Sequence, residues 1–484
     1  MKQSAGLPVL AGCLLVVAVA AGSEPDAASL RRGLDAVLDR RVLSPVFWGV
    51  EVRSLKTGTV LYARNASKAF RPASTLKLVT TAAALDTFGP GERLRTTVET
   101  AGRLDASGRI LGDLLLVGRG DPTLGGGRHG DGQPLRAFEA MADALRAAGV
   151  RVVEGRVVGH EGLFAGERRG NDWGWEDLTW SYGAEVSALS FNDNAVGLKI
   201  SPGEQPTDPA VVDLAPPSRY YRVLSSVITA PPGSKTDLRL IRDLGANVIR
   251  LSGSIAIGDE PWQGWVALED PARFAATVFR EVLEARGIRV TGDIATSGAP
   301  LPAGLRELAA HEGPTTAELI RIVNKESRNL QAEATLRLLG ARLSGEGSAA
   351  AGHIALDEFL RRIGVRTQAW GIEDGSGLAR SNVVTPAGLV DLLVAMDRHP
   401  HAATFRASLP VAGTDGTLKA RMRGTPAEGR LQAKTGTLAL VNALAGYVTN
   451  SEGERLAFAA LANGQVKQAD AQAALDAIGI LLAR

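Results

Sequence analysis

The sequence predicts a mixed α/β protein of two or three domains, with a large region inserted into one of them. The chain has 484 residues, which is too long for a single ordinary hydrophobic core. Hydrophobic residues make up 45% of it and charged residues 22%, a globular composition. About 250 residues separate Lys77 from Ser327, two residues of the candidate site described below. Because a loop of that length is not expected inside a compact domain, an inserted region is needed between them.

The first 22 residues are expected to be a secretory signal peptide. Lys2 precedes an apolar run from Leu7 to Ala21 that ends in small residues, and this run is too short to favour a membrane-spanning helix. Leu10 to Cys13 also resembles a lipoprotein box, which would anchor the protein through Cys13. We favour this alternative less because little apolar sequence precedes that cysteine. Cleavage after Ala20 would remove the only cysteine, so we expect an exported, periplasmic protein without disulfides or a thiol nucleophile.

The segment from Pro72 to Gly89 is predicted to be a helix. Apolar residues recur in it at helical spacing, Ser74 can cap its start, and Gly89 before a proline is a stop signal. Ser74 and Lys77 are three residues apart and therefore share one face of the first turn. Burial among apolar neighbours would favour a neutral Lys77, which can accept a proton from Ser74. Backbone N–H groups at the helix N-terminus would lie where an oxyanion forms.

Two later segments complete a pattern of three motifs. Ser327-Arg328-Asn329 opens a predicted helix, and Lys434-Thr435-Gly436-Thr437 lies in strand-like sequence. In chain order the motifs read Ser-x-x-Lys, Ser-x-Asn and Lys-Thr-Gly, a set found in β-lactamases and penicillin-binding proteins. The neighbouring Lys325 is expected to add positive charge close to the site.

The second and third motifs each occur twice in the chain. Lys56-Thr57-Gly58-Thr59 lies between two alternating runs, so a hairpin turn explains it, and it precedes Ser74. Ser190-Phe191-Asn192 is explained by a turn or a strand end. We therefore assign the motifs to Ser327 and Lys434, which follow Ser74 in the expected order and lie beside a helix start and a strand.

Several other chemistries have no support in the sequence. The six histidines form no His-Glu-x-x-His pair, and the chain has no Gly-x-Ser-x-Gly elbow and no Gly-x-x-x-x-Gly-Lys-Ser/Thr loop. The net charge of +2 gives no reason to expect a nucleic-acid partner. We expect a hydrolase that uses neither a metal nor another cofactor.

With these motifs the chain resembles the D-alanyl-D-alanine carboxypeptidase/endopeptidases of the class C low-molecular-mass penicillin-binding proteins. Four further stretches support the resemblance: Gly120–Leu124, Trp173–Asn194, Asn324–Glu333 and Asp374–Asn382. The likeness covers nearly the whole mature chain, without a departure in the three motifs. It implies the α/β (α+β) serine penicillin-binding/β-lactamase-like transpeptidase fold, an antiparallel sheet with a helical cluster, and an inserted region of two smaller, mostly β domains.

The resemblance and the spacing together suggest domain boundaries. Residues 23–89 and 266–484 are expected to form the catalytic domain, and residues 90–265 the inserted region. The inserted region contains β-like runs at 110–118 and 150–159 and one amphipathic helix at 134–149.

The resemblance and the chemistry agree on an acyl-enzyme mechanism. Ser74 attacks the carbonyl between the two terminal D-alanines of a peptidoglycan stem peptide, and Lys77 takes its proton. Ser327 passes a proton toward the leaving amine, and Lys434 keeps that relay polarised. Water then releases the shortened peptide, whereas a β-lactam mimics the substrate and should acylate the same serine.

The remaining motif residues are expected to bind the substrate. Asn329 holds the substrate amide, and the hydroxyls of Thr435 and Thr437, on either side of Gly436, receive the terminal carboxylate. Backbone N–H groups of Ser74 and Thr437 would form the oxyanion hole.

Asp177 and Arg380 are candidates for recognising the side chain of the substrate. A diaminopimelate side chain can end in both an ammonium and a carboxylate, so its recognition calls for one acid and one base. Two ordinary surface charges are the alternative explanation. Trp173 and Trp175 either line the same cleft or are packed inside.

Two other functions are weighed against this one. A class A β-lactamase would carry a deacylating Glu in a Glu-x-x-Leu-Asn stretch between the first two motifs, and none is present. A non-catalytic peptidoglycan-binding or β-lactam-sensing protein would not need the intact serines and lysines of all three motifs. Release of D-alanine from a pentapeptide would distinguish the three functions.

Overall fold

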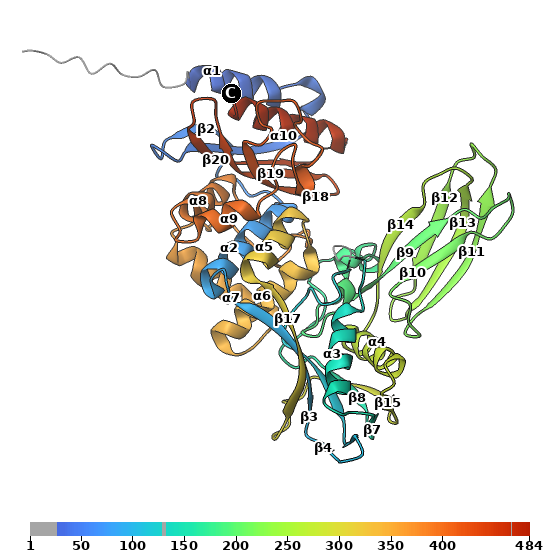
Figure 1. Cartoon of the computed structure of the whole chain (residues 1–484). Coiled ribbons are helices and arrows are strands. Elements are labelled where there is room, and N and C mark those ends of the chain that lie inside the picture. Colours follow the sequence, from blue (N-terminus) through green and yellow to red (C-terminus); the bar gives the residue numbers. More distant parts are fainter. Residues whose placement is uncertain (1–26, 128–131, 466) are drawn as a thin grey trace, which may run out of the picture.

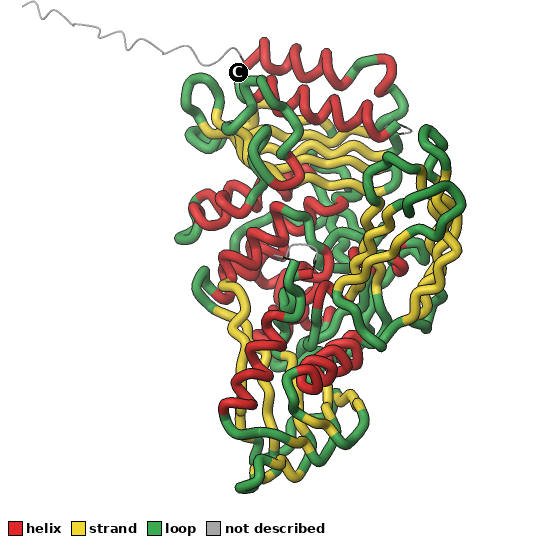
Figure 2. The backbone as a smooth tube through the Cα atoms, turned by 45° about the vertical axis from the view of Figure 1, so that its right-hand side comes forward, coloured by secondary structure: helices red, strands yellow, loops and turns green. Residues whose placement is uncertain are grey.

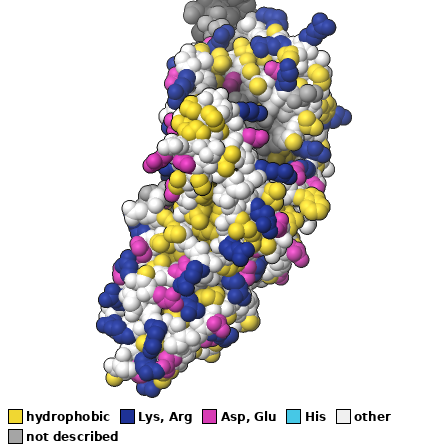
Figure 3. Space-filling model, turned by 90° about the vertical axis from the view of Figure 1, so that its right-hand side faces the viewer, with side chains coloured by type: hydrophobic (Ala, Val, Ile, Leu, Met, Phe, Trp, Pro, Cys, Tyr) yellow, Lys and Arg dark blue, Asp and Glu magenta, His cyan; other side chains and the backbone are white. Residues whose placement is uncertain are grey.

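The computed structural model describes residues 27–127, 132–465 and 467–484 of the chain. The predicted signal peptide, residues 1–22, and Cys13 lie outside the described residues. Figure 1 shows an antiparallel sheet and a cluster of helices at one end of the molecule, and two smaller strand-containing regions beside and below them, the first of which is green. On the face shown in Figure 3, basic and acidic side chains are interspersed rather than gathered into one patch.

Strands from the two ends of the chain form the main antiparallel sheet. Its order is β18-β19-β20-β1-β2, so β1 pairs with β20. The bounds are β1 Phe47–Ser54, β2 Val60–Arg64, β18 Leu431–Leu438, β19 Val441–Thr449 and β20 Arg455–Asn463. Successive residues of a strand point to opposite faces: Ala443 and Tyr447 of β19 join one hydrophobic core, and Leu444 and Val448 join another. Both faces are buried, which explains why β19 and β20 are apolar almost throughout.

Helices cover both faces of this sheet, as the red and yellow segments of Figure 2 show. One face packs against α1 (Ala27–Leu38) and α10 (Gln468–Leu482), which lie side by side. The other face packs against a cluster made of α2 Lys77–Phe88, α5 Thr316–Lys325, α6 Asn329–Ser344, α7 Ala349–Arg362, α8 Pro386–Asp397 and α9 Ala402–Ser408. The mixed α/β fold with an antiparallel sheet and a helical cluster is therefore present.

Helix α2 lies at the centre of the helical cluster. Every residue from Lys77 to Leu85 is buried, and Gly89 ends the helix with a φ of +68°, as a glycine at this position commonly does. The helix predicted for this segment is confirmed. The prediction that Ser74 caps it is wrong, because a 3-10 turn, Ala73–Leu76, extends the helix backwards past Ser74 and no side chain caps that turn.

The chain between α2 and α5 forms the inserted sheets. One sheet has the order β16-β8-β6-β3-β17, a second β15-β7-β5-β4, a third β10-β9-β14 and a fourth β11-β13-β12. The bounds are β3 Arg93–Thr100, β4 Arg103–Leu104, β5 Arg109–Leu111, β6 Leu114–Gly118, α3 Arg136–Ala147, β7 Val152–Val153, β8 Val157–His160, β9 Ala195–Ser201, β10 Val211–Ala215, β11 Arg222–Ala230, β12 Asp237–Arg242, β13 Val248–Ala256, β14 Trp262–Ala267, α4 Pro271–Ala285, β15 Arg289–Val290, β16 Ile294–Ser297 and β17 Arg306–Thr315. The strand-like runs and the amphipathic helix predicted for this region are confirmed.

The elements that follow β14 pack with the inserted sheets. Phe279 and Phe274 of α4 pack with tilted rings against Phe138 and Phe191, respectively, in the same core. Strand β17 pairs with β3, and β16 pairs with β8. On this packing we propose that the inserted region extends to about residue 315 and that the chain returns to the helical cluster at α5.

Candidate active site

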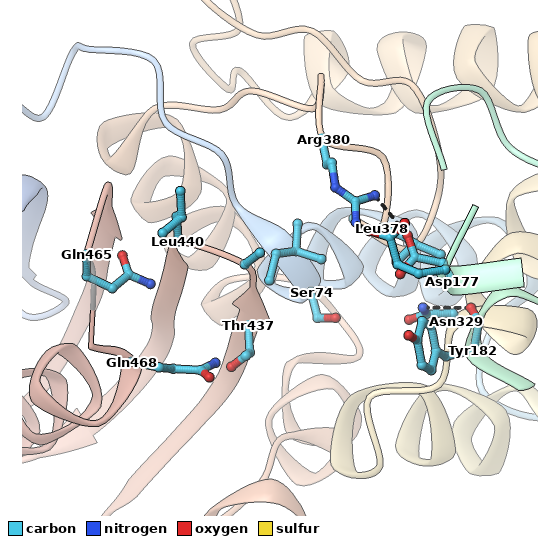
Figure 4. Close-up of a pocket in the computed structure, with 14 residues that line it drawn as sticks. Ser74, Asp177, Tyr182, Asn329, Leu378, Arg380, Thr437, Leu440, Gln465 and Gln468 are labelled. Carbon is cyan, nitrogen blue, oxygen red and sulfur yellow. Dashed lines mark hydrogen bonds and ion pairs between the residues drawn. The ribbon is translucent and has the colours of Figure 1, made fainter. Parts of the chain in front are cut away.

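Ser74 lies in a strained turn at the start of α2. The residue before it, Ala73, has a φ of +47°, a left-handed conformation that is uncommon for a residue other than glycine. Gly377 packs so closely on the carbonyl of Ala73 that a Cβ at this position would overlap it. Tight surroundings of this kind keep a strained backbone in place. The turn presents Ser74 to a cavity of about 640 Å³ (Figure 4).

The nitrogen of Lys77 is surrounded by oxygen atoms that carry no formal charge. Its Nζ lies 2.8 Å from Oγ of Ser74, 2.8 Å from Oδ1 of Asn329 and 2.6 Å from the carbonyl oxygen of Ser376. Burial lowers the pKa of Lys77 to about 7, against the opposing effect of Asp374 and Glu333. A neutral amine has two N–H donors and one lone pair. It can therefore donate to Asn329 and Ser376 while it accepts from the hydroxyl of Ser74.

Two acidic residues lie beneath Lys77 and escaped the sequence analysis. The carboxylate of Asp374, which is 1% exposed, accepts from the backbone N–H of Gly377 and of Ala379, both at 2.7 Å. These bonds shape the loop whose Ser376 carbonyl contacts Lys77. Burial and the neighbouring Asp374 raise the pKa of Glu333 to about 8. The sequence does carry one signal for Asp374, which is the first residue of the family-like stretch Asp374–Asn382 that also contains Arg380.

The second motif connects α5 to α6 and faces the third motif. Ser327 has a φ of +60°, and its Oγ lies 2.8 Å from Nζ of Lys434. Lys434 is fully buried and also donates to its neighbour's carbonyl, that of Thr435, at 2.9 Å. Burial, with a contribution from the nearby Lys77, lowers the pKa of Lys434 well below its usual value. The structure therefore brings both predicted serine–lysine pairs into hydrogen-bonding contact.

Asn329 joins the helical cluster to the inserted region. Its Oδ1 contacts Lys77, and its Nδ2 donates to the backbone carbonyl of Tyr182 at 2.9 Å, the bond drawn in Figure 4. Tyr182 also lines the cavity. It lies in the family-like stretch Trp173–Asn194, but a contact made through its backbone oxygen could not be predicted from the identity of its side chain.

The third motif lies on β18, an edge strand of the main sheet. Gly436 faces the carbonyl of Pro72 so closely, with a Cβ position 2.6 Å from that oxygen, that a side chain would push the strand away from the turn of Ser74. Thr437 is exposed and lines the cavity. The hydroxyl of Thr435 bonds that of Thr417 at 2.8 Å. Thr437 therefore reaches the cavity directly, whereas Thr435 is buried beside it.

Asp177 and Arg380 meet at the edge of the cavity. Nη1 of Arg380 lies 2.8 Å from Oδ2 of Asp177, and a second contact, at 3.2 Å, runs from Nη2 to Glu176. The three side chains come from two segments about 200 residues apart and line the cavity together with Ser74 (Figure 4). The complete lining is Ser74, Glu176, Asp177, Tyr182, Asn329, Gly377, Leu378, Arg380, Thr437, Leu438, Ala439, Leu440, Gln465 and Gln468.

The two tryptophans near the site are not part of the cavity lining. Trp173 is half-buried and donates from Nε1 to Asp374 at 3.0 Å, whereas Trp175 is 77% exposed. The first packs beneath the site, as one of the two alternatives expected, and the second points to solvent. Lys325, expected to add charge near the site, is held in an ion pair with Asp415.

The duplicate motifs lie outside the site. Lys56 is in the turn between β1 and β2, at the edge of the sheet opposite β18. Ser190 is buried and donates to the carbonyl of Ser187 at 2.9 Å, just before the turn that leads into β9. Both interpretations as local turns are confirmed.

Two searches of the described residues gave no result. Within residues 27–127, 132–465 and 467–484, no helix is long and apolar enough to cross a membrane. In the same part of the chain, no three histidine, cysteine or acidic side chains are grouped so that they could hold a metal ion.

Comparison with known sequences gives one family and several relatives. The model of the D-Ala-D-Ala carboxypeptidase 3 (S13) family matches residues 30–484. A D-alanyl-D-alanine carboxypeptidase of Actinomadura sp. (strain R39) is 37% identical over 466 residues, which cover 94% of this chain and 84% of that protein. The D-alanyl-D-alanine carboxypeptidase DacB of Haemophilus influenzae is 25% identical over 423 residues, which cover 86% of this chain and 85% of that protein.

A solved structure confirms the predicted fold. The crystal structure of penicillin binding protein 4 (dacB) from Haemophilus influenzae superposes with a TM-score of 0.79 at 23% identity, covering 94% of this chain and 97% of that one. The same protein complexed with a novel β-lactam superposes with a TM-score of 0.74. The arrangement of sheet, helical cluster and inserted β regions is therefore shared with a penicillin-binding protein.

Proposed function

Because the chain belongs to the D-Ala-D-Ala carboxypeptidase 3 (S13) family and is a serine DD-peptidase that acts on peptidoglycan, we propose that Ser74 is the nucleophile of this enzyme. The observation that carries the proposal is the 2.8 Å contact between Oγ of Ser74 and the nitrogen of a fully buried lysine. Burial lowers the pKa of Lys77 to about 7, so its neutral form, which can accept a proton, is populated near neutral pH.

Acylation begins when the Ser74 hydroxyl attacks the carbonyl carbon between the two terminal D-alanines. The proton of Ser74 passes to the lone pair of Lys77 as the C–O bond forms. Negative charge then develops on the carbonyl oxygen, and the backbone N–H groups of Ser74 and Thr437 are proposed to bind it. One such donor is typically worth about 3–4 kcal/mol in the transition state.

Departure of D-alanine requires a proton for its amine. The proton that Lys77 took from Ser74 is the one that the amine needs. Ser327 can pass its own hydroxyl proton to the leaving amine while it takes up the proton of Lys77, and the nitrogen of Lys434, 2.8 Å from Oγ of Ser327, polarises this relay. The C–N bond breaks, D-alanine leaves, and the peptide remains on Ser74 as an ester. Water hydrolyses that ester and regenerates the hydroxyl.

We propose that the substrate lies along β18 with its terminal carboxylate at Thr435 and Thr437. An edge strand offers unpaired backbone groups to an extended peptide, and β18 is an edge of the main sheet. One N–H of the Asn329 amide is engaged by Tyr182, and the other remains available for a substrate carbonyl. Gly436 keeps this strand close to Ser74.

The ion pair of Asp177 and Arg380 is the proposed site for the substrate's side chain. A diaminopimelate end carries one ammonium and one carboxylate. Its ammonium can bind Asp177 and its carboxylate can bind Arg380, so that four charges of alternating sign replace the two that pair in the free enzyme. The position of the pair at the edge of the cavity supports this proposal.

Two further proposals concern the export of the protein and its inhibition by β-lactams. We propose that residues 1–22 direct the chain to the periplasm and are removed, with attachment through Cys13 as the alternative. β-Lactams are proposed to acylate Ser74, which the β-lactam complex of the related Haemophilus influenzae protein supports. Fractionation of cells and the mass of the mature N-terminus distinguish a free protein from a lipid-anchored one.

A direct experiment tests the assignment of the nucleophile. Purified mature protein is incubated with benzylpenicillin and analysed by intact mass and peptide mapping, in parallel with an assay for D-alanine release from a pentapeptide. We expect one penicilloyl group per chain, on the peptide that contains Ser74, and no adduct and no release in Ser74→Ala. An adduct on another serine would refute the assignment.

A further inference from the structure

A buried ion pair connects the inserted region to the second motif. Arg328 lies between Ser327 and Asn329, and its Nη1 is 3.1 Å from Oδ2 of Asp193. The Arg328 side chain is only 9% exposed and that of Asp193 only 5%. Asp193 directly follows the duplicate Ser190-Phe191-Asn192 motif, so the residue after the duplicate contacts the middle residue of the second motif.

The segment around Asp193 is rigidly built. Asn192, Asp193 and Asn194 all have left-handed φ values of 53°, 58° and 52°, an arrangement that persists only where the surroundings fix it. The Asn194 side chain accepts from the backbone N–H of Phe191 at 3.0 Å and donates to the carbonyl of Glu185 at 2.8 Å. Phe191 itself stacks in the core of the inserted region. These contacts hold the backbone around Asp193 in one conformation.

Two residues at the start of α6 contact the carboxylate of Asp193. Besides the ion pair with Arg328, Asp193 accepts a hydrogen bond from Nε2 of Gln331 at 2.7 Å. The three residues of the second motif therefore reach three different partners. Ser327 contacts Lys434, Asn329 contacts Lys77, and Arg328, between them, contacts the inserted region.

We infer that the Asp193–Arg328 ion pair is a positioning contact that holds Ser327 and Asn329 in place for acylation. The left-handed backbone of Ser327 is not self-supporting, and a side-chain anchor on the next residue fixes it from the opposite side. This inference rests on the proposed function, because it takes Ser327 and Asn329 as catalytic residues. Its consequence is that the inserted region contributes to the geometry of the acylation step itself.

The variants must separate positioning from folding. Removing one member of a buried ion pair leaves an uncompensated charge, whereas replacing both with neutral residues of similar shape often preserves the fold. The main variant is therefore Asp193→Asn with Arg328→Met. Its matched control is Arg53→Met with Asp391→Asn, which removes a partly buried pair of 2.8 Å on β1 and α8, away from the cavity. Arg328→Lys retains the charge with a different head group.

The experiment measures nitrocefin acylation by stopped flow, which separates the acylation rate constant from the binding constant, together with the melting temperature. We expect the main variant to lose roughly tenfold or more in the rate constant, since a misplacement of about 1 Å can cost 10²-fold, with a nearly unchanged binding constant. Arg328→Lys should recover part of that loss. The control should melt at a lower temperature but acylate at the wild-type rate.

Two outcomes overturn the inference. A folded main variant that acylates within twofold of the wild type would refute it, as would a control that loses as much rate as the main variant. If the main variant does not fold, Arg328→Lys decides, because it keeps both charges of the pair and changes only the head group that contacts Asp193. A rate constant equal to that of the wild type in a folded Arg328→Lys then refutes the inference. A Ser327→Ala variant that acylates normally would instead refute the proposed function.

Discussion

Lys77 and Lys434 are both fully buried at the proposed catalytic centre. The described contacts of their nitrogens are all to hydroxyl, amide or carbonyl oxygens. Burial without a contacting carboxylate favours the neutral amine, which is the form that can accept a proton from a serine. The acids Asp374 and Glu333 lie near enough to oppose this effect on Lys77 without bonding to it.

The pH dependence of acylation should report the pKa of Lys77. Because burial lowers this pKa to about 7, most of Lys77 is protonated below pH 7 and cannot act as a base. The acylation rate constant for benzylpenicillin is expected to rise about tenfold per pH unit below pH 6 and to level off above pH 8. Lys77→Arg should abolish the rise, since a guanidinium does not lose its proton. A rate constant that is flat from pH 5 to 9 would show that another group is the base.

Asp177 and Arg380 should discriminate between substrates. We expect Asp177→Ala and Arg380→Ala to weaken the hydrolysis of diaminopimelate-containing peptides by roughly 10–100-fold and that of simple acyl-D-Ala-D-Ala by much less, because only the first substrate offers charges to the pair. Comparison of kcat/KM for the two substrates is the measurement. Equal losses on both would mean that the ion pair only supports the cavity wall.

Among the secondary-structure elements, β18 and the turn before α2 decide where the motifs meet. Gly436 and Gly377 press on that turn from two sides, at the carbonyls of Pro72 and Ala73. The other Lys-Thr-Gly stretch lies at the far edge of the same sheet, so strand order separates the two. Position in the sheet, rather than the residues of the motif, therefore places Lys434 beside Ser327 and Lys56 away from the cavity.

Substitutions in the duplicate motifs should confirm this separation. Ser327→Ala and Lys434→Ala are expected to lower penicillin acylation by a factor of about 10²–10⁴, because acid–base and electrostatic contributions are each of this size. Lys56→Ala should acylate at the wild-type rate, and Ser190→Ala should lose only about 1 kcal/mol of stability. Acylation by a fluorescent penicillin and circular dichroism test both. An inactive Ser190→Ala with an active Ser327→Ala, both folded, would reverse the assignment.

The predictable part of the site is the part with local spacing. The spacing of three residues between Ser74 and Lys77, the helix that ends at Gly89 and the turn at Lys56 all depend on residues close together in the sequence. They could therefore be predicted without knowledge of the tertiary structure. Tyr182 and Asp374 reach the site through contacts between segments distant in sequence, by a backbone carbonyl and by a loop. Such contacts carry no periodicity. Ser74 does not cap its helix because the 3-10 turn Ala73–Leu76 extends the helix backwards past it. Gly377, which is distant in sequence, packs on the carbonyl of Ala73 in that turn.

At the scale of the whole molecule, the segment between α2 and α5 supplies one wall of the cavity that contains Ser74, through Glu176, Asp177 and Tyr182. Its segment 173–182 supplies a contact to Asp374, one to Arg380 and one to Asn329. Sequence spacing indicated an insertion but not that it would contact residues at the cavity. The sequence also contains no sign of the later boundary that we propose, because α4 and β17 look like any amphipathic helix and strand until they are seen to share the core of Phe138 and Phe191.

Loss of the inserted region should abolish acylation. Five of the seven tryptophans lie between Trp173 and Trp265, so tryptophan fluorescence reports chiefly on this region. In a urea titration, labelling by a fluorescent penicillin is expected to disappear no later than the fluorescence transition, because the wall has then unfolded. Trp48→Phe with Trp370→Phe would restrict the signal to the inserted region. Labelling that persists beyond the transition would show that the catalytic centre does not need the wall.

The order of strands in the main sheet has a consequence for how the protein folds as it is synthesised. Strand β1 pairs with β20, and Phe47 faces Asn463 across that pair. Because β1 is synthesised early and β20 near the end of translation, the two strands cannot pair until almost the whole chain is made. Every element of the inserted region is synthesised between the two and finds its partners within that interval, so it can fold first. Ser74, the proposed nucleophile, is synthesised about 360 residues before Lys434 of β18, so the proposed site cannot be complete until the end of the chain is made. An unfinished chain would thus be inert toward cell wall and antibiotic alike, and long-range closure of this kind is slow.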